Sequence, residues 1–375
     1  MGRAGCLLLM VLLLLSPARP AAGQDEPDRV ERRGAEPPLV GRVTLIDDAG
    51  VVIRSAQGAE HFIPWDRVRR LDTDRVEADL EDRLQTAETL WRARSRVERR
   101  DTTLAEPLLE RLFERVRGRT HETALVVAEG LLRCRLERGA NAAAVIPALE
   151  VGRLRRAGVS TASYRMLPAV VDEATALCPQ LAPAWIRSRA LERLQRDLEE
   201  YDARNDAAIA AIARLYLHAV RRQLDGETTE APAALDESVA GHPGVQLLVS
   251  CLACGSDEGE QRRAARGQLR ADLPNLPAWA EGWARYSLGT SLLRETGVAP
   301  RQRGLLDLVH LPARFGRSQP YLAGLALAFC AEASEAWGET AAAETFRDVL
   351  ARRFPNHPVH TAPDPIRSSL TKDAQ

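Results

Sequence analysis

Two cysteines three positions apart, Cys251 and Cys254, form the arrangement in this chain whose spacing is most suggestive of chemistry. Residues three apart on a helix share a face, so the two sulfur atoms can form a disulfide or a redox pair. In thiol oxidoreductases such a pair lies at a helix N-terminus, where the dipole stabilises a thiolate. Residues 245–254 have a helical pattern with Gly255 as the stop, which places the pair at the opposite end. A redox site, a structural disulfide and two small core residues all stay open.

Aromatic and basic residues in the C-terminal third are the candidates for binding a partner. Trp279 and Trp283 are one helical turn apart and share a face. They fit the core of a helical unit, which we favour, or an exposed anchor for a partner peptide. Residues 311–320 are predicted to form a loop that carries Phe315, Arg314 and Arg317. Loops often carry function, so this stretch is the other candidate binding surface.

The near-absence of lysine excludes several enzyme classes. Lys372, near the C-terminus, is the only lysine in the chain. P-loop enzymes, protein kinases, pyridoxal enzymes and Ser-x-x-Lys hydrolases each need a positioned lysine. His121-Glu122 is not continued to the second histidine of a zinc protease, and Glu237-Ser238 lacks the sequel expected in a lytic transglycosylase. We therefore expect no cofactor, no metal and no catalytic residue.

Charge is balanced along the chain. The formal net charge is −1, and arginines are interspersed with acids, as in residues 77–83. Such runs are typical of solvated helix faces. This balance lacks the basic patch of a nucleic-acid-binding protein, so we expect no nucleic-acid partner.

The N-terminal residues 1–23 have the pattern of a signal peptide. Arg3 precedes an apolar run over residues 6–15 that is short for a membrane span, and small residues follow at 21–23. We therefore expect an exported protein, periplasmic or secreted, with no membrane span after cleavage. A retained N-terminal anchor is the alternative.

Two different patterns follow this segment. Residues 24–38 are polar and contain prolines, which predicts a flexible linker. Residues 39–72 contain short apolar runs broken by turn residues at 47–50 and 57–58, which predicts a small module of three or four strands. Its layout resembles the small SH3-like barrels that include the PRC-barrel and Sm-like families. The resemblance implies a barrel-like docking or capping module.

From residue 73 onward the apolar period is helical. Capping signals predict helix starts near Thr120, Asn141 and Ser160, and residues 205–206 predict a break within a long helical pattern. Residues 301–319 are leucine-rich and predict an insertion or a degenerate hairpin. The clearest unit covers residues 321–358, a helix, a turn and a second helix.

Proline-containing motifs recur at the helix ends, around residues 179, 243, 274 and 355. In the last unit, Ala342, Phe346, Val349, Phe354 and Pro355 resemble the signature of the tetratricopeptide repeat, with Gly338 at the turn. The resemblance implies a mostly α solenoid of helical hairpins over residues 73–358, with a concave face that binds peptides or proteins. Residues 359–375 predict a disordered tail.

The sequence therefore predicts an exported, non-catalytic scaffold for a protein or peptide partner. Three alternatives remain: a thiol-disulfide enzyme of the cell envelope that uses Cys251 and Cys254, a hydrolase built from scattered acids, and a self-assembling envelope component. The identity of the partner and the oligomeric state are not indicated.

Overall fold

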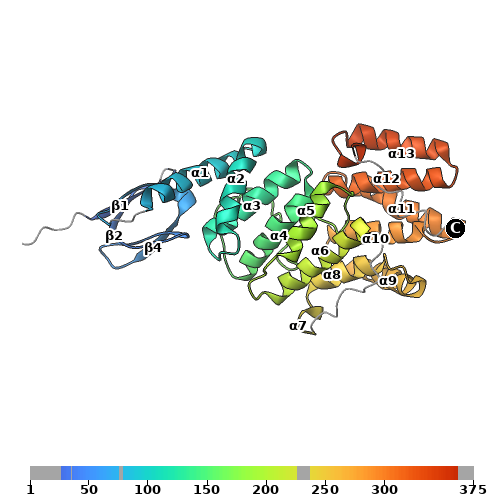
Figure 1. The fold of residues 1–375 in the computed structure, drawn as a ribbon, viewed down its shortest axis with the longest axis horizontal. Coiled ribbons are helices and arrows are strands. Elements are labelled where there is room, and N and C mark those ends of the chain that lie inside the picture. Colours follow the sequence, from blue (N-terminus) through green and yellow to red (C-terminus); the bar gives the residue numbers. More distant parts are fainter. Residues whose placement is uncertain (1–26, 35, 76–78, 226–236, 362–375) are drawn as a thin grey trace, which may run out of the picture.

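The computed structural model describes residues 27–34, 36–75, 79–225 and 237–361. The expected signal peptide at residues 1–23 and most of the expected tail, residues 362–375, lie outside these ranges. Within them the chain is mostly helical, with a small β-sheet at its N-terminal end (Figure 1). None of the described helices combines the length and the apolar composition needed to cross a lipid bilayer.

Five antiparallel strands form an open sheet in the order β4-β3-β2-β1-β5. The strands are Asp28–Arg32 (β1), Leu39–Ile46 (β2), Gly50–Arg54 (β3), Glu60–Pro64 (β4) and Val68–Asp72 (β5). The expected barrel-like module is corrected, because β4 and β5 are opposite edges of the sheet and do not pair. Strand β1 lies between β2 and β5, so three strands separate the two edge strands.

Strand β1 also corrects the expected flexible linker over residues 24–38. It has one fully buried apolar residue, Val30, and it pairs with β2 on one side and β5 on the other. Backbone hydrogen bonds on both sides hold this strand in the sheet. Its sequence has no alternating apolar pattern, which is why periodicity alone does not reveal it.

The inner face of the sheet packs against helix α1, Leu80–Glu98. Ile53, Trp65 and Leu90 are buried and belong to the main hydrophobic core. The short 3-10 turn Trp65–Arg67 links β4 to β5 and also contacts α1. The β module is therefore covered on one face by the helical part of the chain.

Polar contacts join the β module to the helices that follow. Asp66 is fully buried and accepts a hydrogen bond of 3.0 Å from Ser163 Oγ, with Arg94 Nε at 3.2 Å. Burial raises the pKa of Asp66, and Arg94 opposes that shift. Thr123 Oγ1 donates to the carbonyl of Ala49 at 2.8 Å. These contacts fix the orientation of the module.

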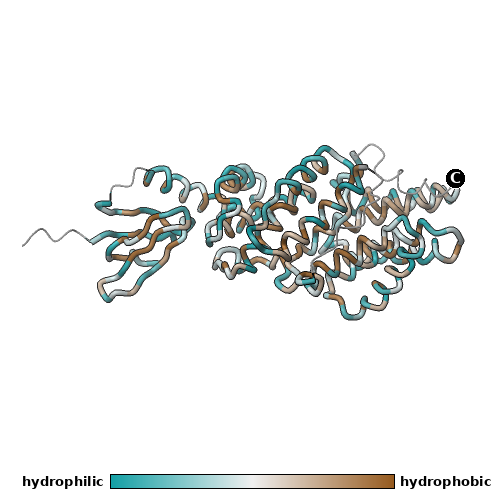
Figure 2. Tube along the Cα trace, turned by 60° about the horizontal axis from the view of Figure 1, so that its bottom comes forward, coloured by the Kyte–Doolittle hydropathy of each residue, from teal (hydrophilic) through white to brown (hydrophobic). Residues whose placement is uncertain are grey.

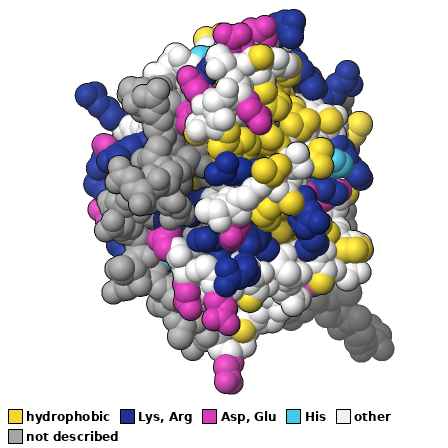
Figure 3. All heavy atoms as spheres, turned by 90° about the vertical axis from the view of Figure 1, so that its right-hand side faces the viewer, with side chains coloured by type: hydrophobic (Ala, Val, Ile, Leu, Met, Phe, Trp, Pro, Cys, Tyr) yellow, Lys and Arg dark blue, Asp and Glu magenta, His cyan; other side chains and the backbone are white. Residues whose placement is uncertain are grey.

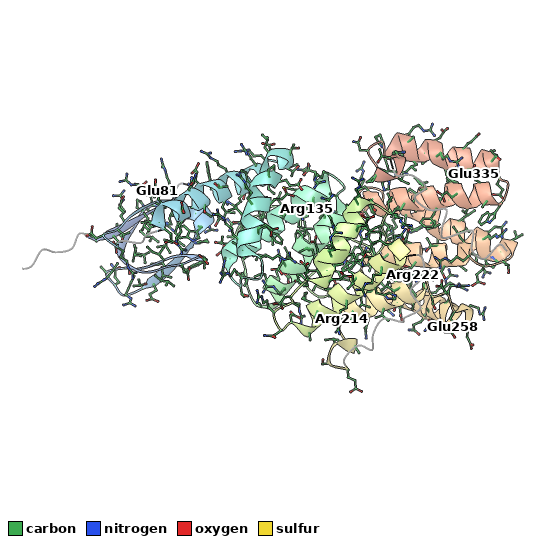
Figure 4. The ribbon with its side chains drawn as sticks, in the orientation of Figure 1. Glu81, Arg135, Arg214, Arg222, Glu258 and Glu335 are labelled. Atoms are coloured by element: carbon green, nitrogen blue, oxygen red, sulfur yellow. The ribbon has the colours of Figure 1, made fainter. Side chains whose placement is uncertain are left out.

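The remaining helices pack mostly against their neighbours in the chain, and at the right-hand end of Figure 1 they are stacked from α9 at the bottom to α13 at the top. Their buried apolar residues form one large core, and Figure 2 shows brown apolar stretches alternating with teal polar stretches along the helices. Arg135 of α3, labelled in Figure 4, ties three helices together: it pairs with Glu110 of α2 at 3.0 Å and donates to the Ala143 carbonyl of α4 at 2.7 Å. The helices are α2 (Thr102–Val116), α3 (Glu122–Glu137), α4 (Asn141–Arg156), α5 (Arg189–Glu199), α6 (Ala207–Asp225), α7 (Glu237–Ala240), α8 (Pro243–Ala253), α9 (Gly259–Asp272), α10 (Ala280–Leu293), α11 (Val298–Arg314), α12 (Pro320–Ala336) and α13 (Thr340–Arg353).

The predicted helix starts near Thr120 and Asn141 and the break at 205–206 are confirmed, but the start near Ser160 is wrong. Residues 157–188 form no helix or strand. Two of them, Tyr164 and Ala176, have positive φ angles of 60° and 55°, which a continuous helix does not allow. Several prolines in this stretch further oppose helix formation.

This irregular segment, residues 157–188, is nevertheless well packed. Trp283 Nε1 of α10 donates to the Pro179 carbonyl at 2.9 Å. The Tyr216 hydroxyl of α6 donates to the Leu181 carbonyl at 2.7 Å. The segment is thereby held by hydrogen bonds from α6 and α10.

The C-terminal hairpin forms as predicted. Helices α12 and α13 pack together, Gly338 makes the turn with a φ of +80°, and α13 ends at Arg353, just before Pro355. The exposed positions of α13 are mostly polar, among them Glu344 and Asp348. A polar outer face of this kind is typical of a helix that closes the end of a helical array.

Candidate functional site

Helix α11 occupies the region for which the sequence predicts an insertion or a degenerate hairpin. It is one continuous helix from Val298 to Arg314, packed between α10 and α12. Leu308 and Leu311 are fully buried on its inner face. Gly304 lies against Gly289 of α10, where an added Cβ would lie 2.9 Å from the Gly289 carbonyl oxygen. The absence of side chains at these two positions lets the helices approach closely.

The outer face of α11 exposes large apolar side chains. Val298, Leu306 and Val309 are 70%, 71% and 37% exposed. At about 100° per residue they fall on one stripe of the helix. Figure 3, which looks onto the right-hand side of Figure 1, shows a face on which hydrophobic side chains gather beside basic ones. An exposed apolar surface rimmed by polar residues is a candidate binding site.

Basic residues line one side of this stripe. Arg303 and Arg314 are exposed and lie beside the apolar stripe on the helix surface. His310 lies on the same side of the stripe. Together with Val298, Leu306 and Val309 we call these residues the α11 surface. The only acid of the helix, Asp307, is 8% exposed. The α11 surface therefore presents apolar and positive groups to solvent.

Arginines of neighbouring helices neutralise the acids beside the α11 surface. Asp307 contacts Arg270 of α9 at 2.9 Å and Arg285 of α10 at 3.1 Å. Glu281 of α10 contacts Arg285 at 2.8 Å and Arg314 at 3.5 Å. Both carboxylates are therefore paired with arginines of this chain.

Burial shapes the ionisation of this network. It raises the pKa of Asp307, although Arg270 and Arg285 oppose the shift. Burial also lowers the pKa of His310, with Arg285 acting in the same direction, so this ring is neutral at pH 7. Burial by itself raises the pKa of Glu281. The hydrogen bond and the positive charge of Arg285 outweigh burial, so the pKa of Glu281 is lowered overall.

Trp279 and Trp283 occupy the start of α10. Their rings pack edge to face with centroids 5.1 Å apart. Trp283 is buried and donates to the irregular segment, while Trp279 is half-buried and its carbonyl accepts a 2.6 Å hydrogen bond from Gln319 Nε2. Trp283 is therefore a core residue. Trp279 is only half-buried, and its ring packs against that of Trp283.

The predicted loop at residues 311–320 is shorter than expected, because α11 continues to Arg314. Phe315 is buried at 6% exposure, so its ring is not free to anchor a partner. The Arg314 guanidinium lies 5.8 Å from the centre of that ring. Arg317 is exposed. The structure thus keeps Arg314 and Arg317 on the surface and moves Phe315 into the core.

Cys251 and Cys254 are free thiols, so the candidate disulfide is not formed. Cys251 belongs to the main core, whereas Cys254 packs in a separate small cluster with Leu269 and Leu288. Burial raises the pKa of each thiol to about 12. A thiol with so high a pKa is a poor nucleophile at pH 7.

The surroundings of this pair also disfavour a thiolate. The cysteines lie at the C-terminal end of α8, as expected. Arg222 of α6, labelled in Figure 4, reaches this end and its Nη1 donates to the Leu252 carbonyl at 3.4 Å. Burial lowers the pKa of Arg222 to about 10. Arg222 therefore caps the helix rather than activating a cysteine.

Two surface hollows flank Arg156 of α4, with volumes of about 420 and 500 Å³. Arg156 Nε donates to Asp206 at 2.8 Å, and its Nη1 lies 3.2 Å from His242 Nε2. Burial, helped by Arg156, lowers the pKa of His242. The polar groups between the hollows are thus engaged with one another.

Among the described residues, no group of three or more His, Cys, Asp or Glu side chains is placed to hold a metal ion.

Comparisons of the chain with protein-family models, with curated proteins and with solved structures find no match. The functional assignment therefore rests on the chain's own geometry. The α11 surface is not evident from the sequence, because Pro300, Gly304 and Pro312 weaken the helical pattern of that stretch. The signal that could have found it is the helical spacing of Val298, Leu306 and Val309.

Proposed function

We propose that the protein is an exported, non-catalytic scaffold, built as a solenoid of helical hairpins, that binds a partner protein or peptide. The observation that carries the proposal is the α11 surface, an exposed apolar stripe bordered by Arg303 and Arg314. Export is proposed from the signal-peptide pattern of residues 1–23. N-terminal sequencing of the protein from its source tests that part, since an intact Met1 would contradict cleavage.

The chemistry of the surface indicates the kind of segment it accepts. Leu306 and Val309 are less than one turn apart and suit apolar side chains on one face of an amphipathic helix. Arg303 and Arg314 suit carboxylates on the same helix, beside its apolar face. Burying the two apolar side chains contributes about 1.5–3 kcal/mol each. The exposed arginines chiefly raise the association rate and select against basic partners.

The thiol-enzyme alternative has less support. Cys251 and Cys254 are buried, their pKa values are about 12, and they pack into different clusters. A catalytic thiol needs access to substrate and a low pKa.

Binding of designed peptides tests the proposal directly. An amphipathic helical peptide with leucines on one face and glutamates on its flanks is compared with a copy that has lysines in place of the glutamates. We expect the acidic peptide to bind the full chain more tightly, and added salt to weaken it. Leu306→Ser should reduce its affinity about tenfold or more.

Leu104→Ser is the matched control, because Leu104 is an exposed leucine, 56% accessible, on the distant helix α2. It should leave peptide affinity unchanged. Equal affinity for the two peptides, or equal loss in the two variants, would remove the support for the α11 surface.

A further inference from the structure

The joint between the β module and the helices contains a buried polar cluster, independent of the α11 surface and of the proposed function. At its centre is Asp66, which lies in the 3-10 turn and is fully buried. Asp66 Oδ2 accepts a 3.0 Å hydrogen bond from Ser163 Oγ and lies 3.2 Å from Arg94 Nε of α1. The β module, helix α1 and the irregular segment therefore meet at one carboxyl group. In Figure 1 the β module lies at one end of the molecule with α1 beside it.

The geometry of the joint stabilises the charged form of Asp66 poorly. Within the described part of the chain, Asp66 Oδ1 has no hydrogen-bond partner, and Arg94 Nε has none either. The contact between Asp66 and Arg94 is therefore an ion pair without an aligned hydrogen bond. A buried carboxylate needs both charge pairing and hydrogen bonds to replace its lost hydration. The hydrogen bond that reaches Asp66 comes from a neutral hydroxyl group.

Neighbouring charges offset this burial only in part. Burial is the strongest influence on Asp66 and raises its pKa above the ordinary value of 3.8. Arg94, the hydroxyl hydrogen bond and Arg67 oppose the shift, but Arg94 also contacts Glu98 of α1 at 3.3 Å. Glu122 of α3 is a second carboxylate near Asp66 and raises its pKa further.

Tyr164 is the titratable group that the irregular segment brings to this joint. Burial raises the pKa of Tyr164 well above its ordinary value, and the charges of Glu129 and Asp66 act in the same direction. Its hydroxyl, which donates to the Val126 carbonyl at 3.3 Å, therefore stays neutral in mild acid and at pH 8. It does not compete with Asp66 for the proton.

We propose that this joint is a pH-sensitive latch, which holds the β module more tightly when Asp66 takes up a proton in mild acid. Protonation removes a buried charge that the joint stabilises poorly. When the joint opens, water hydrates Asp66 and its pKa returns to the ordinary value of 3.8. The closed joint therefore binds the proton more readily than the open joint does.

The direction of the pH dependence follows from this difference. The pKa of Asp66 is higher in the closed joint than in the open one, so the proton favours the closed state. Its contribution is complete below pH 3.8 and is lost as the pH rises through the raised pKa of the closed joint. Opening of the joint should therefore be rarer in mild acid than at pH 8.

Hydrogen exchange of the full chain measures opening of the joint, through the amides of β5 and α1. Rates are compared at pH 4.5 and pH 8 after correction for the intrinsic effect of pH on exchange. Opening of the wild type should be about threefold or more rarer at pH 4.5. Asp66→Asn has nearly the same shape and carries no charge, so it should open equally rarely at both pH values.

Asp307→Asn is the matched control, because Asp307 on α11 is also a buried acid whose pKa is raised by burial. It should keep the wild-type pH dependence at the joint. An Asp66→Asn variant that opens more often than the wild type at pH 8 would show that the ionised carboxylate holds the joint closed, and would overturn the proposal. The same pH dependence in Asp66→Asn and the wild type would also overturn it.

Carbon-13 NMR of the aspartate carboxyl groups over a pH series gives a second readout, with the Asp66 signal identified by its absence in Asp66→Asn. We expect its titration midpoint to lie above 3.8 in the wild type. Ser163→Ala should move the midpoint higher still, because it removes a hydrogen bond that favours the charged form. A wild-type midpoint at or below 3.8 would leave the closed joint without a preference for the proton, and the latch would be ruled out.

Discussion

Gly289 of α10 and Gly304 of α11 lie against each other, with the side chain of Leu308 packed over Gly289 and that of Leu293 over Gly304. A Cβ on Gly289 would lie 2.6 Å from Leu308 Cγ, and a Cβ on Gly304 would lie 2.9 Å from the Gly289 carbonyl oxygen. This contact sets the position of α11, and with it the presentation of the α11 surface.

Gly304→Ala should therefore destabilise the protein by about 1–3 kcal/mol, because the new methyl group has no space, even though alanine favours helices. Urea unfolding measures the change. Gly267→Ala on α9 is the control, since nothing lies within 4 Å of an added Cβ there, and it should stabilise the protein by about 0.5–1 kcal/mol. A Gly304→Ala variant as stable as the wild type would contradict the close packing.

Stability should fall in mild acid through His357. Its Nε2 lies 2.9 Å from the Tyr321 carbonyl oxygen, its Nδ1 accepts from the Val359 amide at 3.2 Å, and burial lowers its pKa to about 4. The unfolded chain binds this proton near pH 6.5, before the folded protein does. The contribution of His357 is complete above pH 6.5 and declines as the pH falls toward 4.

The expected loss from this histidine is on the order of 3 kcal/mol. His357→Gln cannot titrate, so its unfolding free energy should change less between pH 7 and pH 4.5 than that of the wild type. Denaturant unfolding at several pH values checks this. Identical pH profiles for the two proteins would show that another group is responsible.

Trp283→Phe should loosen the irregular segment at residues 157–188. The variant loses the 2.9 Å hydrogen bond to the Pro179 carbonyl and leaves that carbonyl unpaired, a change of about 1–3 kcal/mol. Hydrogen exchange should accelerate in the segment. Trp337→Phe serves as the control, because Trp337 instead lies beneath Arg301 at the end of α12, and it should leave exchange in the segment unchanged.

The thiols at positions 251 and 254 should stay unreactive toward a disulfide reagent in the native protein and react once guanidinium unfolds it. Cys254→Ser should leave peptide binding intact, because both thiols are buried away from α11. A native disulfide between Cys251 and Cys254, detected by mass spectrometry, would instead restore the structural-disulfide interpretation.

Local sequence patterns predicted the C-terminal hairpin and the position of the cysteine pair. Gly338 and Pro355 bound helices whose apolar faces repeat every three or four residues. Cys254 directly precedes Gly255 at the end of an apolar stretch. In these places local signals and tertiary packing agree, so periodicity and stop residues are sufficient.

Local sequence patterns do not predict the structure where contacts between distant residues outweigh local preference. β1 is held by hydrogen bonds to strands on either side, not by its own pattern. Phe315 lies in a sequence that resembles a loop, yet its ring is buried.

By itself, the sequence predicted that this chain is mostly helical and that a small β unit precedes the helices. Those properties follow from composition and from periods a few residues long. Only the tertiary structure decided that the sheet is open, that residues 157–188 lie between helices and that α11 exposes an apolar and basic face. Exposure depends on which distant helices approach one another, and here the contact between Gly289 and Gly304 sets that approach for α11.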